Sequence, residues 1–220
     1  MKSDMHIAQN LQAIRSGLPP HVTLVAVSKT KPVELIMEAY QAGQRVFGEN
    51  KIQEMADKHA QLPKDIQWHM IGHVQTNKVK HMAPFVSLIH GVDSLKLLAE
   101  IDKQAQKNNR TIDCLLQIHI AREESKFGLD ENELFELLAS DDFRKFQNVQ
   151  VKGLMGMATF TDNQDQIVKE FTFLKRLFDR CKIGHPQFTI LSMGMSGDYP
   201  LAISAGSTMI RIGSSIFGDR

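Results

Sequence analysis

The sequence predicts one (β/α)8 barrel of the TIM type that spans residues 1–220. Short apolar runs alternate with longer segments of helical periodicity, eight such runs occur, and 220 residues suit one domain with a sizeable core. Alternating strands and helices are typical of a parallel sheet, and eight units favour its closure into a barrel. An open doubly wound sheet is the alternative, because alternation alone does not fix closure.

The expected strands are short runs rich in β-branched and apolar residues, bounded by turn-forming residues. The first run, from Val22 to Val27, leads directly into Ser28 and Lys29. In chain order, the eight runs are 22–28, 45–48, 66–71, 85–92, 111–120, 149–158, 187–193 and 208–213.

The expected helices lie between these runs, where apolar residues recur every three or four positions. Residues 1–6 are typical of the start of a polar amphipathic helix. Pro32 suits a first helical turn, Gly43 suits a helix end, and both Asp93-Ser94 and Asp162 suit N-caps. The apolar positions of three helices are Val33, Ile36, Met37 and Tyr40; Leu98, Ile101 and Ala105; and Ile167, Phe171, Leu174 and Phe178.

Composition and charge exclude several classes of function. Lys plus Arg number 26 and Asp plus Glu number 25, so we expect no strong attraction to nucleic acid or to an anionic membrane. No apolar run approaches the roughly 20 residues that span a bilayer, and the N-terminus does not resemble a signal peptide. The only cysteines are Cys114 and Cys181, which makes a disulfide framework unexpected and a reducing cytoplasm the expected location.

Scattered histidines and methionines do not indicate a metal site. His69 and His73 lie on or just after an expected strand, where their spacing does not form the zinc site that it forms on a helix. His90 is expected to be a loop or packing residue. The methionines expected to fill gaps in the barrel are Met155, Met157, Met193 and Met195.

Lys29 is the first candidate functional residue, because it stands at the C-terminal tip of an expected buried strand. The βα loops of a barrel gather at this end, and active sites lie there. Partial desolvation would favour the neutral amine, which attacks aldehydes. The alternative is a lysine that pairs with a carboxylate such as Glu49.

Two Gly/Ser turns follow the last two expected strands and supply a second feature. One turn contains Ser196 and Gly197, and the other contains Gly213 and Ser214. Backbone N–H groups and hydroxyls in such turns bind phosphate, and the last strands of a barrel are a common place for it. An amine that attacks aldehydes beside a phosphate clamp predicts a phosphorylated aldehyde as cofactor, and pyridoxal 5′-phosphate (PLP) fits best.

The chain resembles the pyridoxal phosphate homeostasis proteins, which are similar to the N-terminal barrel of alanine racemase. The matching motifs occur in order from residue 26 to the end of the sequence, so the resemblance covers essentially the whole chain. They are AVSKTKP at 26–32, FGEN at 47–50, WHMIGH at 68–73, ESKFG at 124–128, GLM at 153–155, LSMGMS at 191–196 and RIGSSIFG at 211–218.

The resemblance implies a monomeric barrel of the alanine racemase N-terminal type, in which Lys29 holds PLP as a Schiff base. It further implies that Ser196, Gly213 and Ser214 contact the phosphate, with Gly197 in the same turn. His73 stands where many members have proline. Ser214 stands where threonine is common, and serine keeps the hydroxyl.

The resemblance also implies that Asn50 approaches the cofactor ring and that Arg211 faces the pyridine nitrogen. An arginine there disfavours protonation of the ring nitrogen and weakens the ring as an electron sink. Transaminase-like chemistry would then be poorly supported.

The function expected is intracellular PLP homeostasis, meaning storage, buffering or delivery of this form of vitamin B6, without robust catalysis. Partners would be PLP itself and, transiently, apo forms of PLP enzymes. A PLP-dependent amino-acid racemase is the main alternative, but efficient racemisation needs a second base, and neither Tyr40 nor Tyr199 is an obvious candidate. A Schiff-base aldolase acting on a sugar phosphate is a further alternative, and it predicts no visible absorbance band.

Overall fold

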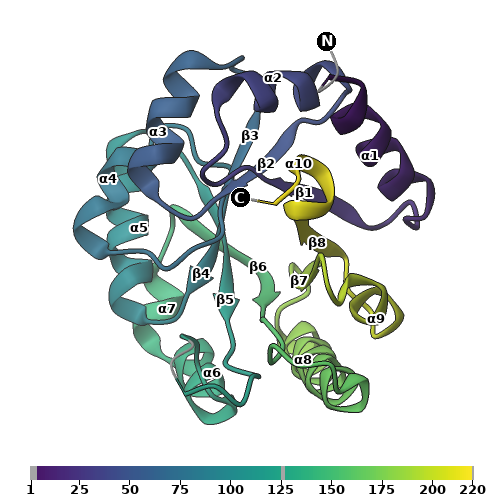
Figure 1. Cartoon of the computed structure of the whole chain (residues 1–220). Coiled ribbons are helices and arrows are strands. Elements are labelled where there is room, and N and C mark those ends of the chain that lie inside the picture. The colour runs from purple at the N-terminus through teal and green to yellow at the C-terminus, as the bar shows by residue number, and fades with distance from the viewer. Residues whose placement is uncertain (1–3, 125–126, 220) are drawn as a thin grey trace.

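Eight parallel strands form a closed barrel in which each strand pairs with its neighbours in sequence and the last pairs with the first. The computed structural model describes residues 4–124 and 127–219. Helices surround the strands, and the short α10 lies over one end of the barrel near β1 (Figure 1). The prediction of a closed (β/α)8 barrel is therefore confirmed, and the open sheet is excluded. The domain range of 1–220 stays a prediction.

All eight predicted strands are present. The strands are β1 Thr23–Val27, β2 Val46–Glu49, β3 Gln67–Met70, β4 Leu88–Val92, β5 Ile112–Gln117, β6 Val149–Met155, β7 Ile190–Met195 and β8 Met209–Ile212. The helices between and around them are α1 Asp4–Ser16, α2 Val33–Gln41, α3 Ile52–Gln61, η1 Thr76–Lys78, α4 Val79–Met82, α5 Leu95–Lys107, α6 Glu131–Ala139, α7 Asp141–Lys145, α8 Gln164–Gly184, α9 Tyr199–Ser204 and α10 Ser214–Phe217.

The ends of several predicted elements need correction. β4 begins at Leu88 rather than at 85, because the Val86 N–H still donates to the Met82 carbonyl at the end of α4. β5 and β6 stop before the ends of their apolar runs, whose last residues form loops at the barrel mouth. β7 begins later than predicted and continues to Met195, because Gly194 adopts a φ of 105° where its pairing with β8 shifts register.

The predicted capping residues are mostly correct. Ser94 caps α5 by accepting a hydrogen bond from the Leu97 N–H, at 3.1 Å. Pro32 is the N-cap residue of α2 rather than part of its first turn. The N-cap of α8 is Asn163 and not Asp162, since the Asn163 side chain accepts from the Gln166 N–H. The first helix begins at Asp4, and residues 1–3 lie outside the described residues.

The hydrophobic core has an outer and an inner part, as alternation along the strands requires. Leu24 and Ala26 of β1 pack in the large cluster between strands and helices, whereas Val25 belongs to a separate small cluster. The small cluster fills the barrel interior from five strands with Val25, Leu88, Leu115, Met155 and Met209. The barrel interior is thus a packed core rather than an open channel.

Three findings bear on the sequence-based expectations about disulfides, membranes and metals. Cys114 and Cys181 are both buried and unpaired. No helix among the described residues is long and apolar enough to cross a membrane. In the same part of the chain, no group of three or more His, Cys, Asp or Glu side chains is arranged to hold a metal ion.

Candidate functional site

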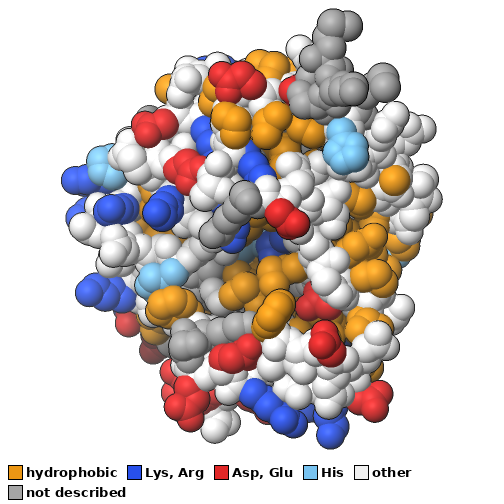
Figure 2. Space-filling view, in the orientation of Figure 1, with side chains coloured by type: hydrophobic (Ala, Val, Ile, Leu, Met, Phe, Trp, Pro, Cys, Tyr) orange, Lys and Arg blue, Asp and Glu red, His pale blue; other side chains and the backbone are white. Residues whose placement is uncertain are grey.

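A cavity of about 740 Å³ opens at the end of the barrel where the βα loops gather. In the space-filling view, Lys or Arg side chains lie within a hollow near the centre of this face, and hydrophobic side chains gather beside it (Figure 2). All of the residues predicted for the site line this one cavity: Lys29, Asn50, Ser196, Gly197, Arg211, Gly213 and Ser214. Their roles toward a cofactor stay predictions.

Pairing of the first and last strands brings the two halves of the site together. In the register of β1 and β8, Val25 lies opposite Arg211 and Ala26 opposite Ile212. The turn after β1 therefore lies beside the turn after β8, and the first carries Lys29. The turn with Ser196 joins them because β7 is the other neighbour of β8.

Lys29 is half-buried and does not pair with Glu49, which was the alternative explanation for this lysine. Within residues 4–124 and 127–219, Lys29 has no ion pair. Glu49 is fully buried and instead pairs with Lys58 of α3, with 2.6 Å between Nζ and Oε1. Burial raises the pKa of Glu49, and the hydrogen bonds from Lys58 and Ser28 oppose this rise. Lys29 is thus left to face the cavity.

Arg211 is 3% exposed and is held by oxygen acceptors inside the barrel. Its guanidinium donates to the Ser192 hydroxyl, to the Ser192 carbonyl at 3.2 Å and to the Gly156 carbonyl at 3.2 Å. Burial lowers the pKa of Arg211 to about 10, while the negative charge of Asp198 opposes the fall. Arg211 therefore stays positively charged at neutral pH.

A buried chain of hydrogen bonds extends from Arg211 into the barrel. His90 Nδ1 lies 2.9 Å from Ser192 Oγ, and His90 Nε2 lies 2.9 Å from His69 Nδ1. Burial lowers the pKa of His69 to about 3. Burial also lowers the pKa of His90 well below its ordinary value, and electrostatic interactions with His69 and Arg211 add to the effect.

Arg211 fixes the direction of the first of these hydrogen bonds, because a guanidinium only donates. Ser192 Oγ therefore accepts from Arg211. In the other two hydrogen bonds, the tautomers of His90 and His69 decide which atom donates. Burial keeps both histidines neutral at pH 7.

Sequence reasoning missed this series of buried hydrogen bonds and treated His90 as a loop or packing residue. The structure corrects this, because His90 is fully buried and hydrogen-bonded at both ring nitrogens. The signal was the two-residue period of the strands. His69 and Arg211 each alternate with outward-facing apolar residues, so they point into the barrel.

The methionines divide between packing and the cavity. Met155 and Met193 are fully buried among core residues, as predicted for gap-filling side chains. Met157 and Met195 instead line the cavity. His73 also lines it and stacks on Phe127, with ring centroids 3.8 Å apart. Ser125 and Lys126, which precede Phe127 in one of the matching motifs, lie outside the described residues.

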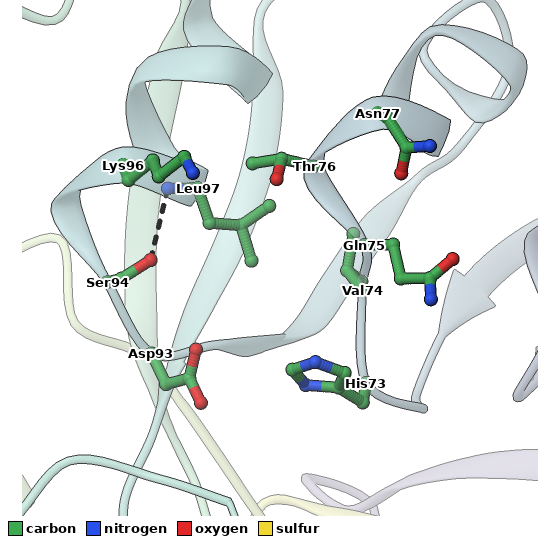
Figure 3. A pocket seen from close by; sticks show the side chains of 9 residues that line it. All are labelled: His73, Val74, Gln75, Thr76, Asn77, Asp93, Ser94, Lys96 and Leu97. Carbon is green, nitrogen blue, oxygen red and sulfur yellow. Dashed lines mark hydrogen bonds between the residues drawn. The ribbon is translucent and has the colours of Figure 1, made fainter.

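A smaller pocket of about 360 Å³ lies beyond His73, between the loop after β3 and the start of α5 (Figure 3). Thr76, Asn77 and Lys96 contribute polar groups to its wall. The Ser94 hydroxyl is occupied in capping α5, as the dashed line in Figure 3 shows. Because Lys29 and the Gly/Ser turns all lie in the larger cavity, that cavity is the candidate site.

Comparison with known proteins agrees with the barrel fold. The family described as alanine racemase, N-terminal domain, matches residues 4–220. The solved structure of alanine racemase from Clostridium difficile aligns with 98% of this chain and 56% of its own, with a TM-score of 0.78 at 14% identity, which shows the shared fold. The chain is thus an alanine-racemase-type barrel with a lysine and two Gly/Ser turns at the C-terminal ends of its strands.

Proteins with higher sequence identity to this chain identify its family within this class of barrels. A pyridoxal phosphate homeostasis protein of Vibrio alginolyticus is 38% identical, with 97% of each chain covered. The structure of PipY from Synechococcus elongatus with PLP bound has a TM-score of 0.88 at 38% identity, covering 96% of this chain and 100% of PipY. The chain belongs to the pyridoxal phosphate homeostasis protein family.

Proposed function

We propose that this protein binds PLP covalently through Lys29 and serves intracellular PLP homeostasis by storing, buffering or delivering the cofactor. One observation carries the proposal: an amine, a buried guanidinium and two Gly/Ser turns face a single cavity. The resemblance to PipY, whose structure contains PLP, supports it.

The donor set in the cavity fits PLP. The aldehyde of PLP condenses with a primary amine and releases one water, and this is the chemistry that the cofactor would supply. Lys29 offers the amine, and Asn50 offers an amide that can contact the ring. The groups that would bind the phosphate are the hydroxyls and backbone N–H groups of Ser196, Gly197, Gly213 and Ser214.

Arg211 supports a role in cofactor handling rather than catalysis. Its guanidinium is charged at neutral pH and is held by hydrogen bonds to Ser192 and Gly156, so it would face the pyridine nitrogen as a permanent cation. A cation there keeps the ring nitrogen unprotonated and limits the ring as an electron sink. Chemistry that needs a strong electron sink would therefore be slow.

The racemase alternative needs a second base across the cofactor from Lys29. Tyr40 is committed elsewhere, since its hydroxyl donates to Asp65 at 2.8 Å on the surface. Tyr199 begins α9 and packs against the core. Among the described residues that line the cavity there is no tyrosine.

The open mouth of the cavity supports delivery to other proteins. Three of the five large apolar side chains that are exposed among the described residues lie there: Phe127, Phe160 and Met195. Phe160 is 97% exposed, and such a group suits a brief contact with an apo form of a PLP enzyme. We further propose that the protein acts as a monomer in the cytoplasm and binds neither nucleic acid nor membrane.

The test is an absorbance spectrum of the purified protein with added PLP, followed by borohydride reduction and mass spectrometry. We expect a visible band and a reduced phosphopyridoxyl group on Lys29. Lys29→Ala should abolish the band and retain some phosphate-mediated binding of PLP. An unchanged band in Lys29→Ala would refute the assignment of this lysine, and no band in the wild type would favour the aldolase alternative.

A further inference from the structure

The turn that carries Lys29 has a strained backbone. The Lys31 N–H donates to the Ser28 carbonyl at 3.1 Å, so Lys29 and Thr30 occupy the two central positions of a turn. Thr30 has a φ of 64°, in the left-handed region that β-branched residues avoid. A turn of this kind persists only where surrounding groups hold it.

Two side chains of α3 hold the residues on either side of Lys29. Lys58 Nζ donates to the Ser28 carbonyl at 2.8 Å. The Thr30 N–H donates to Glu54 Oε1 at 2.6 Å. Lys58 and Glu54 also pair with each other at 2.8 Å, one helical turn apart. The backbone immediately before and after Lys29 is therefore tied to one rigid helix.

The clamp on Lys29, which consists of Glu54 and Lys58, is anchored in the protein interior. Lys58 is 6% exposed and pairs with the fully buried Glu49, which also accepts from the Ser28 hydroxyl at 2.8 Å. Water is largely excluded around Lys58 and Glu49, so the hydrogen bonds that these two charged groups make to each other and to Ser28 are strong and hold one geometry. Burial alone would raise the pKa of Glu54, but hydrogen bonds from Lys58 and the Thr30 N–H outweigh it and lower the pKa. Glu54 is thus ionised at neutral pH and accepts both bonds.

We propose that Glu54 and Lys58 are positioning residues that fix the turn of residues 28–31 and thereby aim the Lys29 amine at the aldehyde carbon of PLP. The inference rests on the proposed function. In the covalent step the Lys29 nitrogen forms a double bond to that carbon, and the aldehyde oxygen leaves as water after taking up the two amine protons. Glu54 and Lys58 touch neither reacting atom, and they act by restricting where the amine can be.

The test compares two ligands on Glu54 variants. Pyridoxine 5′-phosphate keeps the ring and phosphate of PLP but has an alcohol in place of the aldehyde, so its affinity reports the pocket without Lys29 chemistry. Glu54→Ala should weaken PLP binding about tenfold, the effect of losing a charged hydrogen bond, and change pyridoxine 5′-phosphate affinity less than about twofold. Glu54→Gln keeps an oxygen for the Thr30 N–H and should restore most of the PLP affinity.

Matched variants separate positioning from a general loss of structure. Asp57→Ala alters an exposed acidic residue of the same helix and should bind both ligands as the wild type does. Glu54→Asp keeps the charge but is too short to reach the Thr30 N–H, and it should show the selective loss even if Glu54→Ala does not fold. Equal losses for both ligands, or undiminished PLP binding in folded Glu54→Asp, would overturn the proposal. If wild-type protein binds both ligands equally and forms no band, the proposed function fails instead.

Discussion

Lowering the pH from 7 to 5 should weaken the fold through His69, one of two neutral histidines inside the barrel. His69 is 4% exposed and shares a hydrogen bond with His90, with 2.9 Å between His69 Nδ1 and His90 Nε2. Its pKa falls from 6.5 in the unfolded chain to about 3 in the folded protein because of burial. Folding lowers the pKa of such a group. Its contribution to the free energy of unfolding is fully present above the unfolded pKa and is lost as the pH falls toward the folded pKa.

The size of the effect follows from proton uptake by the unfolded chain alone. Over most of the window between pH 6.5 and 3 the folded His69 takes up no proton, so each pH unit costs about 1.4 kcal/mol. At pH 5 the free energy of unfolding should be lower by about 2 kcal/mol than at pH 7 from this residue. His90 adds to the loss in the same direction, because its pKa is also lowered by burial.

Urea unfolding at pH 7, 6 and 5 measures this loss in the wild type and in His69→Gln. Glutamine has a carbonyl oxygen that can accept from His90, and it does not titrate. The variant should therefore lose about 2 kcal/mol less stability than the wild type on going from pH 7 to 5. His21→Gln, at an exposed histidine, controls for the removal of a histidine as such. Equal losses of stability on acidification in His69→Gln and in the wild type would refute the conclusion that His69 stays neutral in the folded protein.

Three other changes test the site and the fold. Arg211→Glu should permit protonation of the pyridine nitrogen and so shift the visible spectrum of the PLP-loaded protein; an unaltered spectrum would argue that Arg211 does not face the ring. Gly153→Ala should lower the free energy of unfolding by at least about 3 kcal/mol, because the new Cβ would overlap the Ile190 carbonyl oxygen in the neighbouring strand. Near-wild-type stability in urea unfolding would contradict this packing. Phe171→Ala, at a fully buried position of α8, should lower the free energy of unfolding by about 3–5 kcal/mol in the same assay. A loss under about 1 kcal/mol would mean that α8 does not cover the barrel as described.

The strands were predictable because each is a short apolar run between turn residues, a pattern that depends on local sequence. Their ends depend on pairing. β7 passes through Gly194, and nothing local indicates that this glycine continues a strand rather than ending it. The register shift opposite β8 allows the continuation. Similarly, Asp162 and Asn163 are both good N-cap residues, and only the geometry of α8 selects the second.

The cavity-lining residues were predictable because barrels collect their strand ends at one mouth, so Lys29 and Arg211 could be expected to meet. The clamp on Lys29 was not recognised. Its signal was the spacing of Ile52, Met55 and Lys58 on α3, which puts a lysine on the apolar face of the helix. That spacing indicates burial, but the partners of Lys58 lie on other elements, and sequence alone does not identify them.

The site straddles the seam at which the barrel closes. β1 and β8 are the first and last strands, and their pairing closes the barrel. A ligand that bridges Lys29 and the turn at Ser214 joins the two sides of this seam, and so binds the closed ring but not an opened one. Occupancy should therefore slow hydrogen exchange at β1 and β8 more than at β4 and β5 on the opposite side. The concentration of the cofactor in the cell would then determine how long β1 and β8 stay paired in each molecule.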